Sequence, residues 1–163
     1  MQVFLLFVVP MVFGLLISIL LGLIFGSFGS VLLSRWGESE SLAQASSILW
    51  GRSECPHCKK RLQAWDLVPL LSFFLQKGRC RYCHKKISLL YPILELGSAL
   101  IFAGVWQSFA EQGLGMVAFW TASGWMLWLM LVYDVLRYEV HLPLLIALNL
   151  VLFLAMAIGL FPW

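Results

Sequence analysis

Long uncharged hydrophobic runs make up most of the chain, and short polar segments separate them. Four runs are long enough to form transmembrane helices: residues 3–34, 89–110, 112–133 and 142–163. A helix needs about 20 apolar residues to cross the hydrocarbon core of a bilayer. Glu95 is the one charged residue within these runs. We therefore predict an all-α integral membrane protein with about four transmembrane helices.

The composition supports a membrane protein. Of the 163 residues, 61% are hydrophobic and 12% are charged. This charged share is about half that of a typical soluble domain. We expect membrane lipid, and no nucleic acid, among the partners of the chain.

The positive charges are concentrated in one loop, which predicts the orientation of the chain. Of the 11 Lys and Arg residues, all but Arg137 lie between Arg35 and Lys86, and Arg137 follows the third run. Positively charged loops stay on the cytoplasmic side of a membrane. We therefore expect this loop to be cytoplasmic and both termini to lie outside. Topology alone explains the bias, and an anionic ligand of the loop is the alternative.

All four cysteines of the chain lie in this basic loop, in two CxxC pairs. Cys55 and Cys58 form the first pair, Cys80 and Cys83 form the second pair, and 21 residues separate the two pairs. Two such turns can place four thiolates around a tetrahedral Zn²⁺ ion. Cytosolic cysteine clusters usually bind metal rather than form disulfides. We predict a structural zinc site, with a redox-active dithiol pair or bystander cysteines as alternatives.

The hydrophobic runs and the cysteines together predict three parts. Residues 1–34 form the first transmembrane helix, residues 35–88 form a cytoplasmic tetracysteine zinc module, and residues 89–163 form transmembrane helices two to four. Within the module, the segment between the cysteine pairs is apolar, with Leu67, Val68, Leu70, Leu71, Phe73 and Phe74. A module this small cannot bury all of them, so we expect them to pack on the membrane face or on the helix ends.

Small residues near the end of the first run predict a close helix contact. Gly22, Gly26 and Gly29 follow one another at helical spacing. Small residues at such spacing let a second helix approach closely.

Two carboxylates lie at the predicted ends of transmembrane helices. Glu95 lies about one turn into the second helix, where it either faces a polar cavity or caps the positive helix N-terminus. Asp134 directly follows the uncharged third run. Because a charge in a membrane segment is costly, Asp134 is a candidate functional residue, and an interfacial ion pair with Arg137 is the alternative.

Three motifs follow one another along the chain. The first is Gly26-Ser27-Phe28-Gly29-Ser30-Val31, followed by Arg35. The second consists of the two CxxC pairs, with Trp65-Asp66-Leu67-Val68-Pro69 between them and Tyr91-Pro92 after them. The third is Tyr133-Asp134, followed by Arg137 and Glu139. In this order they resemble the bacterial type IV prepilin peptidases, over residues 22–143. The third motif is similar to the first catalytic-aspartate motif of that family.

The resemblance implies an intramembrane aspartyl endopeptidase of the inner (plasma) membrane. Such an enzyme cleaves the leader peptide from prepilins and pseudopilins on the cytoplasmic side. Many members also methylate the new N-terminus, which makes S-adenosylmethionine a second candidate cofactor beside Zn²⁺. An aspartyl protease needs two carboxylates that share a site. The resemblance assigns Asp134 as the first of them.

The chain departs from the family pattern at the second aspartate. It contains two aspartates, Asp66 and Asp134, and no GxGD motif. Asp66 matches a position in the metal module of the family. His141 occupies a position where the family usually has a proline. It is either a catalytic base or a loop histidine at the membrane interface. We therefore expect an N-terminal portion of a prepilin peptidase, either truncated or one half of a split enzyme, that is inactive without a separate polypeptide carrying the GxGD helix.

Two other functions are compatible with the same sequence. One is a non-catalytic membrane zinc module that binds prepilins or scaffolds a pilus or secretion assembly. The other is a remnant that retains only the methyltransferase activity. A reading frame that encodes GxGD downstream of the codon for Trp163 favours the split or truncated peptidase, and its absence favours the non-catalytic zinc module.

Overall fold

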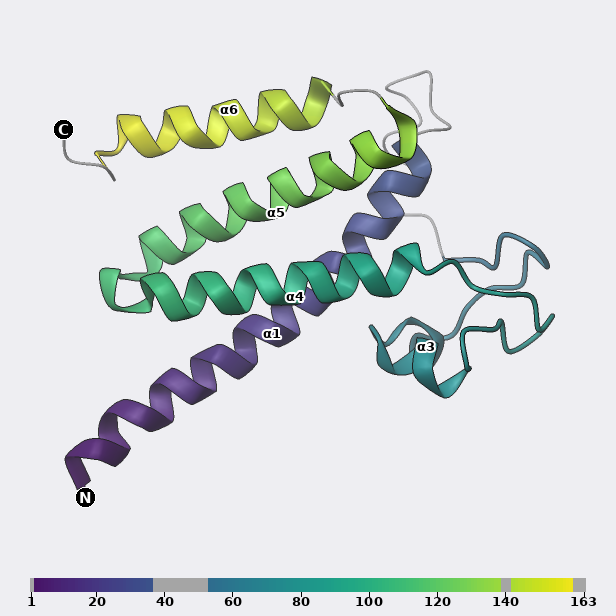
Figure 1. The fold of residues 1–163 in the computed structure, drawn as a ribbon, viewed down its shortest axis with the longest axis horizontal. Helices are drawn as coiled ribbons and strands as arrows, with labels where there is room; N and C mark the ends of the chain where they lie inside the picture. The colour runs from purple at the N-terminus through teal and green to yellow at the C-terminus, as the bar shows by residue number, and fades with distance from the viewer. Residues whose placement is uncertain (1, 37–52, 139–141, 160–163) are drawn as a thin grey trace. The chain divides into compact units, whose positions relative to one another are not determined.

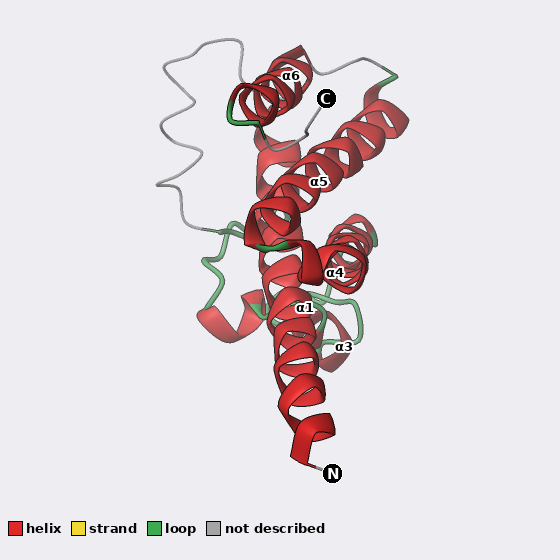
Figure 2. Cartoon of the chain, turned by 90° about the vertical axis from the view of Figure 1, so that its left-hand side faces the viewer, coloured by secondary structure: helices red, strands yellow, loops and turns green. Residues whose placement is uncertain are grey.

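The computed structural model describes residues 2–36, 53–138 and 142–159 (Figure 1). The predicted connector at residues 37–52, together with Glu139 and His141, lies outside the described residues. Every regular element within the described ranges is a helix, and these ranges contain no strand beyond isolated bridges (Figure 2). The predicted all-α fold, with a tetracysteine segment between the first two long helices, is confirmed.

Three helices are long and apolar enough to cross a membrane. They are α1 (Gln2–Trp36), α4 (Leu90–Phe109) and α5 (Leu114–Arg137). The fourth hydrophobic run contains α6 (Leu142–Ala157), a shorter apolar helix of 16 residues. The last residues of that run, 160–163, lie outside the described part of the chain. The described residues thus contain three spans of sufficient length and a shorter fourth helix.

The end of α5 differs from the predicted boundary. The hydrophobic run ends at Tyr133, but the helix continues for one more turn to Arg137 because no proline or glycine interrupts it. Tyr138 then adopts a left-handed conformation with φ 57°, and its backbone N–H donates to the carbonyl oxygen of Asp134 at 2.7 Å. Asp134 therefore lies in the last turn of a helix.

The chain divides into two compact units. The first unit is Leu23–Leu96, and the second unit combines Met1–Gly22 with Gly97–Trp163. In the second of these units α5 and α6 pack side by side (Figure 1). The start of α1 also contacts α4, and the Trp106 indole N–H donates to the carbonyl oxygen of Met11 at 3.2 Å. At Gly22 a Cβ atom would lie 2.5 Å from the Cα of Ala99. The missing side chain lets the two backbones approach, as the small residues predicted.

The unit Leu23–Leu96 contains the end of α1, the metal module and the start of α4. The module has two short helices, the 3₁₀ helix η2 (Ala64–Leu67) and α3 (Leu71–Leu75). Here too α1 and α4 approach closely, because a Cβ atom at Gly26 would lie 2.5 Å from the Cα of Glu95. This contact places the last turns of α1 beside Glu95, near the start of α4.

Candidate metal centre

Each CxxC pair forms the same backbone turn. In the first turn, the N–H of Lys59 donates to the Cys55 carbonyl at 2.9 Å, and the N–H of Cys55 donates to the Lys60 carbonyl at 3.0 Å. The second turn repeats both hydrogen bonds 25 residues later, at 2.9 Å each. The residue after each pair, Lys59 or His84, has a positive φ of 55° or 57°. The two turns are structural repeats of each other.

A short antiparallel bridge closes each of the two turns. The bridges join Glu54 to Arg61 and Arg79 to Lys86. The Lys60 ammonium lies 4.9 Å from the centre of the Tyr82 ring, which links the first turn to the second. The shared pattern C-x-x-C-x-K-[RK]-[LI], which begins at Cys55 and at Cys80, is the sequence signal of this repeat beyond the cysteines themselves.

The four thiols lie close enough together to hold one metal ion. The sulfur atoms of Cys55, Cys58, Cys80 and Cys83 all lie within 4.8 Å of one another. The Sγ atoms of Cys55 and Cys83 are 3.9 Å apart. A tetrahedral ion with metal–sulfur bonds of about 2.3 Å places its sulfurs about 3.8 Å apart. Cys55 and Cys80 are buried, so the cluster is partly closed to solvent.

The local environment shifts the pKa values of two of these thiols in opposite directions. Burial opposes ionisation of Cys55, but hydrogen bonds from the backbone of Cys58 and His57 and from neighbouring thiols outweigh it, and its pKa is lowered to about 7. At Cys83 a backbone hydrogen bond from Lys85 favours the thiolate, but burial and the other thiols raise the pKa to about 11. The cluster therefore holds a readily formed thiolate at Cys55 beside the Cys83 thiol, whose raised pKa keeps it protonated, and a bound cation would displace that proton.

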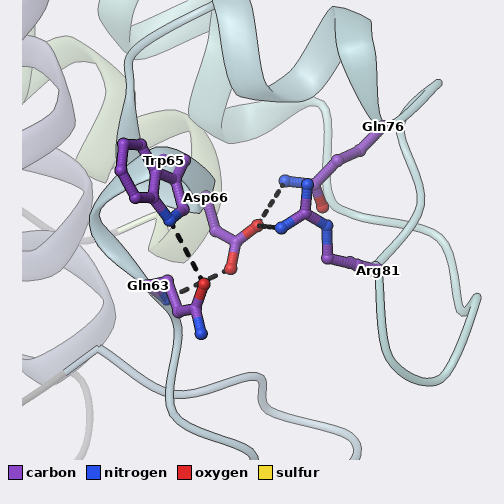
Figure 3. A network of polar contacts seen from close by, with 5 residues as sticks. All are labelled: Gln63, Trp65, Asp66, Gln76 and Arg81. Atoms are coloured by element: carbon purple, nitrogen blue, oxygen red, sulfur yellow. Dashed lines mark hydrogen bonds and ion pairs between the residues drawn. The ribbon is translucent and has the colours of Figure 1, made fainter.

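Asp66 connects three segments of the module (Figure 3). Its side chain is only 2% exposed and accepts hydrogen bonds of 3.1 Å from the backbone N–H of Gln63 and from the Gln76 side chain. The Arg81 guanidinium lies 3.8 Å from the same carboxylate. The Trp65 indole N–H donates to the Gln63 side chain at 3.2 Å. This carboxylate is fully engaged in holding the linker against the second cysteine turn.

Glu95 is buried in the second turn of α4, beyond the first turn that an N-terminal cap would occupy. Its Oε2 accepts a 2.7 Å hydrogen bond from the backbone N–H of Leu70, which directly precedes α3. Ser27 of α1 lines the same cavity as this carboxylate. The sequence predicted that Glu95 either faces a cavity or caps the helix N-terminus. The structure shows the first arrangement, because Glu95 lines a cavity.

That cavity has a volume of about 740 Å³ and lies entirely within Leu23–Leu96. Its wall carries hydroxyl groups of α1, among them Ser27 and Ser30, and the buried cysteines Cys55 and Cys80. The Ser30 hydroxyl donates to the Ser27 carbonyl at 2.6 Å. The four-cysteine cluster thus borders a largely apolar hollow whose wall at the end of α1 carries hydroxyl groups.

Asp134 belongs to the other compact unit, the one that contains α5. It is exposed, and within the described part of the chain no ion pair joins its carboxylate to Arg137. Its catalytic role stays a prediction. Glu139 and His141, the other candidates of this motif, lie outside the described residues.

The fold and the site define a class of helical membrane protein with a tetracysteine module between its first two long helices. A family model described as "Bacterial Peptidase A24 N-terminal domain" matches residues 20–109, which is more than half of the chain. The chain belongs to this family.

Curated relatives support this assignment. The chain is 35% identical over 121 residues to a "Prepilin leader peptidase/N-methyltransferase" of Burkholderia pseudomallei, across 63% of this chain and 39% of the relative. It is 38% identical over 122 residues to a "Type 4 prepilin-like proteins leader peptide-processing enzyme" of Escherichia coli, across 68% of this chain and 41% of the relative. A Bacillus subtilis "Prepilin leader peptidase/N-methyltransferase" is 47% identical over 57 residues, which are 35% of this chain and 23% of the relative. The chain spans about two fifths of the length of the first two relatives. No solved structure matches it.

Proposed function

We propose that the chain forms the N-terminal part of an intramembrane aspartyl peptidase that removes the leader peptide from type IV prepilins and pseudopilins. The observation that carries this proposal is the family match over residues 20–109, joined to relatives that are named as prepilin leader peptidases. Asp134 is the proposed first catalytic carboxylate. Its place in the last turn of a membrane-length helix supports this role, because leader cleavage takes place at the membrane boundary.

The second catalytic carboxylate comes from another polypeptide segment in this proposal. An aspartyl protease requires one ionised and one protonated carboxyl group in contact. Asp66 is the other aspartate of the chain, and its carboxylate is occupied by Gln63, Gln76 and Arg81. We therefore infer that these 163 residues do not cleave prepilins alone, and that a segment bearing a GxGD motif completes the site.

Zinc is the proposed metal of the tetracysteine centre. The four sulfur atoms lie within 4.8 Å of one another. Four thiolates are a usual ligand set of structural zinc, and they leave no open position for a substrate. The metal therefore stabilises the module and takes no part in hydrolysis. Methylation of the new N-terminus is part of the proposal because relatives are named N-methyltransferases. S-adenosylmethionine as the methyl donor rests on the family resemblance of the sequence.

The proposed location is the inner membrane, with the metal module in the cytoplasm. The three long apolar helices and the family support a membrane location. The placement of the module rests on the positive charges of the loop between α1 and α4. In this arrangement, residues 1–34 and 89–163 cross the membrane and residues 35–88 form the module.

A reconstituted cleavage assay tests the proposal. The 163-residue chain is combined in liposomes with a purified prepilin and with a polypeptide that carries a GxGD helix from a full-length relative. Cleavage that requires both polypeptides supports the proposal. Prepilin that binds the chain but is never cleaved would instead support the non-catalytic zinc module that binds prepilins or scaffolds a pilus or secretion assembly.

A further inference from the structure

The short helix α3 has an apolar face that the described residues leave exposed. Leu71, Phe74 and Leu75 are 55%, 70% and 74% exposed. Their spacing of three and four residues places them on one face of the helix. Ser72 and Gln76 belong to the opposite face, since both line the cavity and Gln76 reaches Asp66 (Figure 3). The polar side of α3 therefore meets the module, and the apolar side is exposed apart from an edge-on contact between the Phe74 and Phe73 rings.

Leu70, which directly precedes α3, is hydrogen bonded to Glu95 of the membrane-length helix α4, and Glu95 in turn contacts the membrane-length helix α1. Leu70 donates to Glu95, which lies five residues after the start of the candidate span Leu90–Gln112. At 1.5 Å per residue, this is about 7.5 Å from the end of the span. Gly26, which contacts Glu95, lies eight residues before the end of the span Val9–Ser34, or about 12 Å along that helix. Both helices place Leu70 at the depth of the headgroup region or just below it.

The backbone of this segment is suited to such a depth. Irregular backbone near lipid needs partners for its N–H groups, because lipid supplies none. Pro69 has no N–H group, and Leu70 donates to Glu95. Hydrogen bonds within the segment engage the N–H groups of Leu71, Ser72, Phe74, Gln76, Lys77 and Gly78. The apolar side chains can therefore enter lipid without leaving these donors unpaired.

We propose that α3 is an interfacial membrane anchor, whose Leu71, Phe74 and Leu75 side chains enter the bilayer that α1 and α4 cross. Leu67 and Val68, both 41% exposed, add apolar side chains shortly before this helix. Trp65 is 68% exposed, and tryptophan favours the headgroup region. Lys77, exposed just after α3, supplies a cation for lipid phosphates. The anchor fixes the height of the metal centre above the membrane.

Quenching by lipid in nanodiscs tests the anchor directly. A small fluorescent amino acid is introduced at position 74 of the 163-residue chain, and the lipids carry bromine atoms, which quench nearby fluorophores. Matched probes at Lys59, exposed in the first cysteine turn, and at Leu127, exposed in the middle of α5, give the water and lipid references. Bound metal is measured in each sample to show that the module is intact.

We expect bromolipid to quench the probe at position 74 much more than the probe at Lys59. Bromine close to the headgroups should be the most effective quencher at position 74, whereas bromine near the chain ends should be the most effective at Leu127. Quenching at position 74 that is no greater than at Lys59, in samples with intact metal, would overturn the proposal. Such a result would show that water or a protein partner covers this face.

Discussion

The backbone N–H of Leu70 donates a 2.7 Å hydrogen bond to the Glu95 carboxylate, and this bond joins the metal module to a membrane-length helix. Leu70 adopts φ 57° and ψ −49°, a conformation that side-chain-bearing residues rarely occupy. Such a conformation costs on the order of 1–3 kcal/mol and persists only where its surroundings hold it. The Glu95 carboxylate is one such restraint.

Removal of this carboxylate should loosen the module from α4. Glu95→Ala leaves the Leu70 N–H without an acceptor, which costs about 1–3 kcal/mol for a buried group. Glu95→Gln retains a carbonyl acceptor, so we expect a smaller loss. Hydrogen exchange at the Leu70 amide measures both effects. Equal protection of this amide in the wild type and in Glu95→Ala would show that the bond does not hold the module.

Loss of one sulfur should remove the metal. We expect about one Zn²⁺ per wild-type chain, and little or none in Cys55→Ser or Cys80→Ser, because four thiolates close the site. The module should then unfold, since a structural zinc contributes directly to folding free energy. Elemental analysis of purified protein measures the zinc. His57→Ala and His84→Ala are the matched controls and should keep it; zinc-free wild-type protein prepared under reducing conditions would refute the assignment.

The sequence predicts the elements of this protein better than their contacts. Charge-free runs identified α1, α4 and α5 because a span must exclude charge over its whole length. The two CxxC pairs identified the metal cluster because four thiols at such spacing have few other uses. The extra turn of α5 that contains Asp134 was missed, because the hydrophobic pattern ends where lipid contact ends rather than where the helix ends.

The polar contacts of the module could not be predicted in the same way. Asp66 and Glu95 accept hydrogen bonds from Gln76 and Leu70, which are 10 and 25 residues away in the chain. Such contacts depend on how the linker folds back between the cysteine turns, and no periodic pattern encodes that path. The sequence therefore left two roles open for Glu95, and the structure distinguishes them.

A side chain at Gly26 should disturb the contact between α1 and α4. In Gly26→Ala the new Cβ would lie 2.5 Å from the Cα of Glu95, and the helices must move apart. Overpacking of this kind costs about 1–3 kcal/mol. Gly104→Ala is the matched control, because a Cβ there meets nothing within 4 Å. Unfolding by denaturing detergent compares the two, and equal midpoints would contradict the close approach.

The orientation of the chain has its own test. Glu111, between α4 and α5, should react with an impermeant reagent added outside intact cells once it is replaced by cysteine. A cysteine at Lys77, in the basic module, should react only after the cells are opened. Labelling of Lys77 rather than Glu111 from outside would place the module, and the end of α5 with Asp134, on the wrong side for leader cleavage.

Prepilin cleavage by the reconstituted pair of polypeptides, with each aspartate of this chain replaced in turn, tests the central claim most directly. Asp134→Asn should abolish cleavage, because an amide cannot share a proton with the second carboxylate. Asp66→Asn should retain cleavage, since its side-chain oxygen can still accept from Gln63 and the Gln76 amide can turn to face its NH₂ group. Zinc content is measured in both variants to show that the module is folded. Loss of cleavage in Asp134→Asn alone is the predicted result, whereas cleavage by Asp134→Asn, or by the 163-residue chain without its partner, would contradict the account.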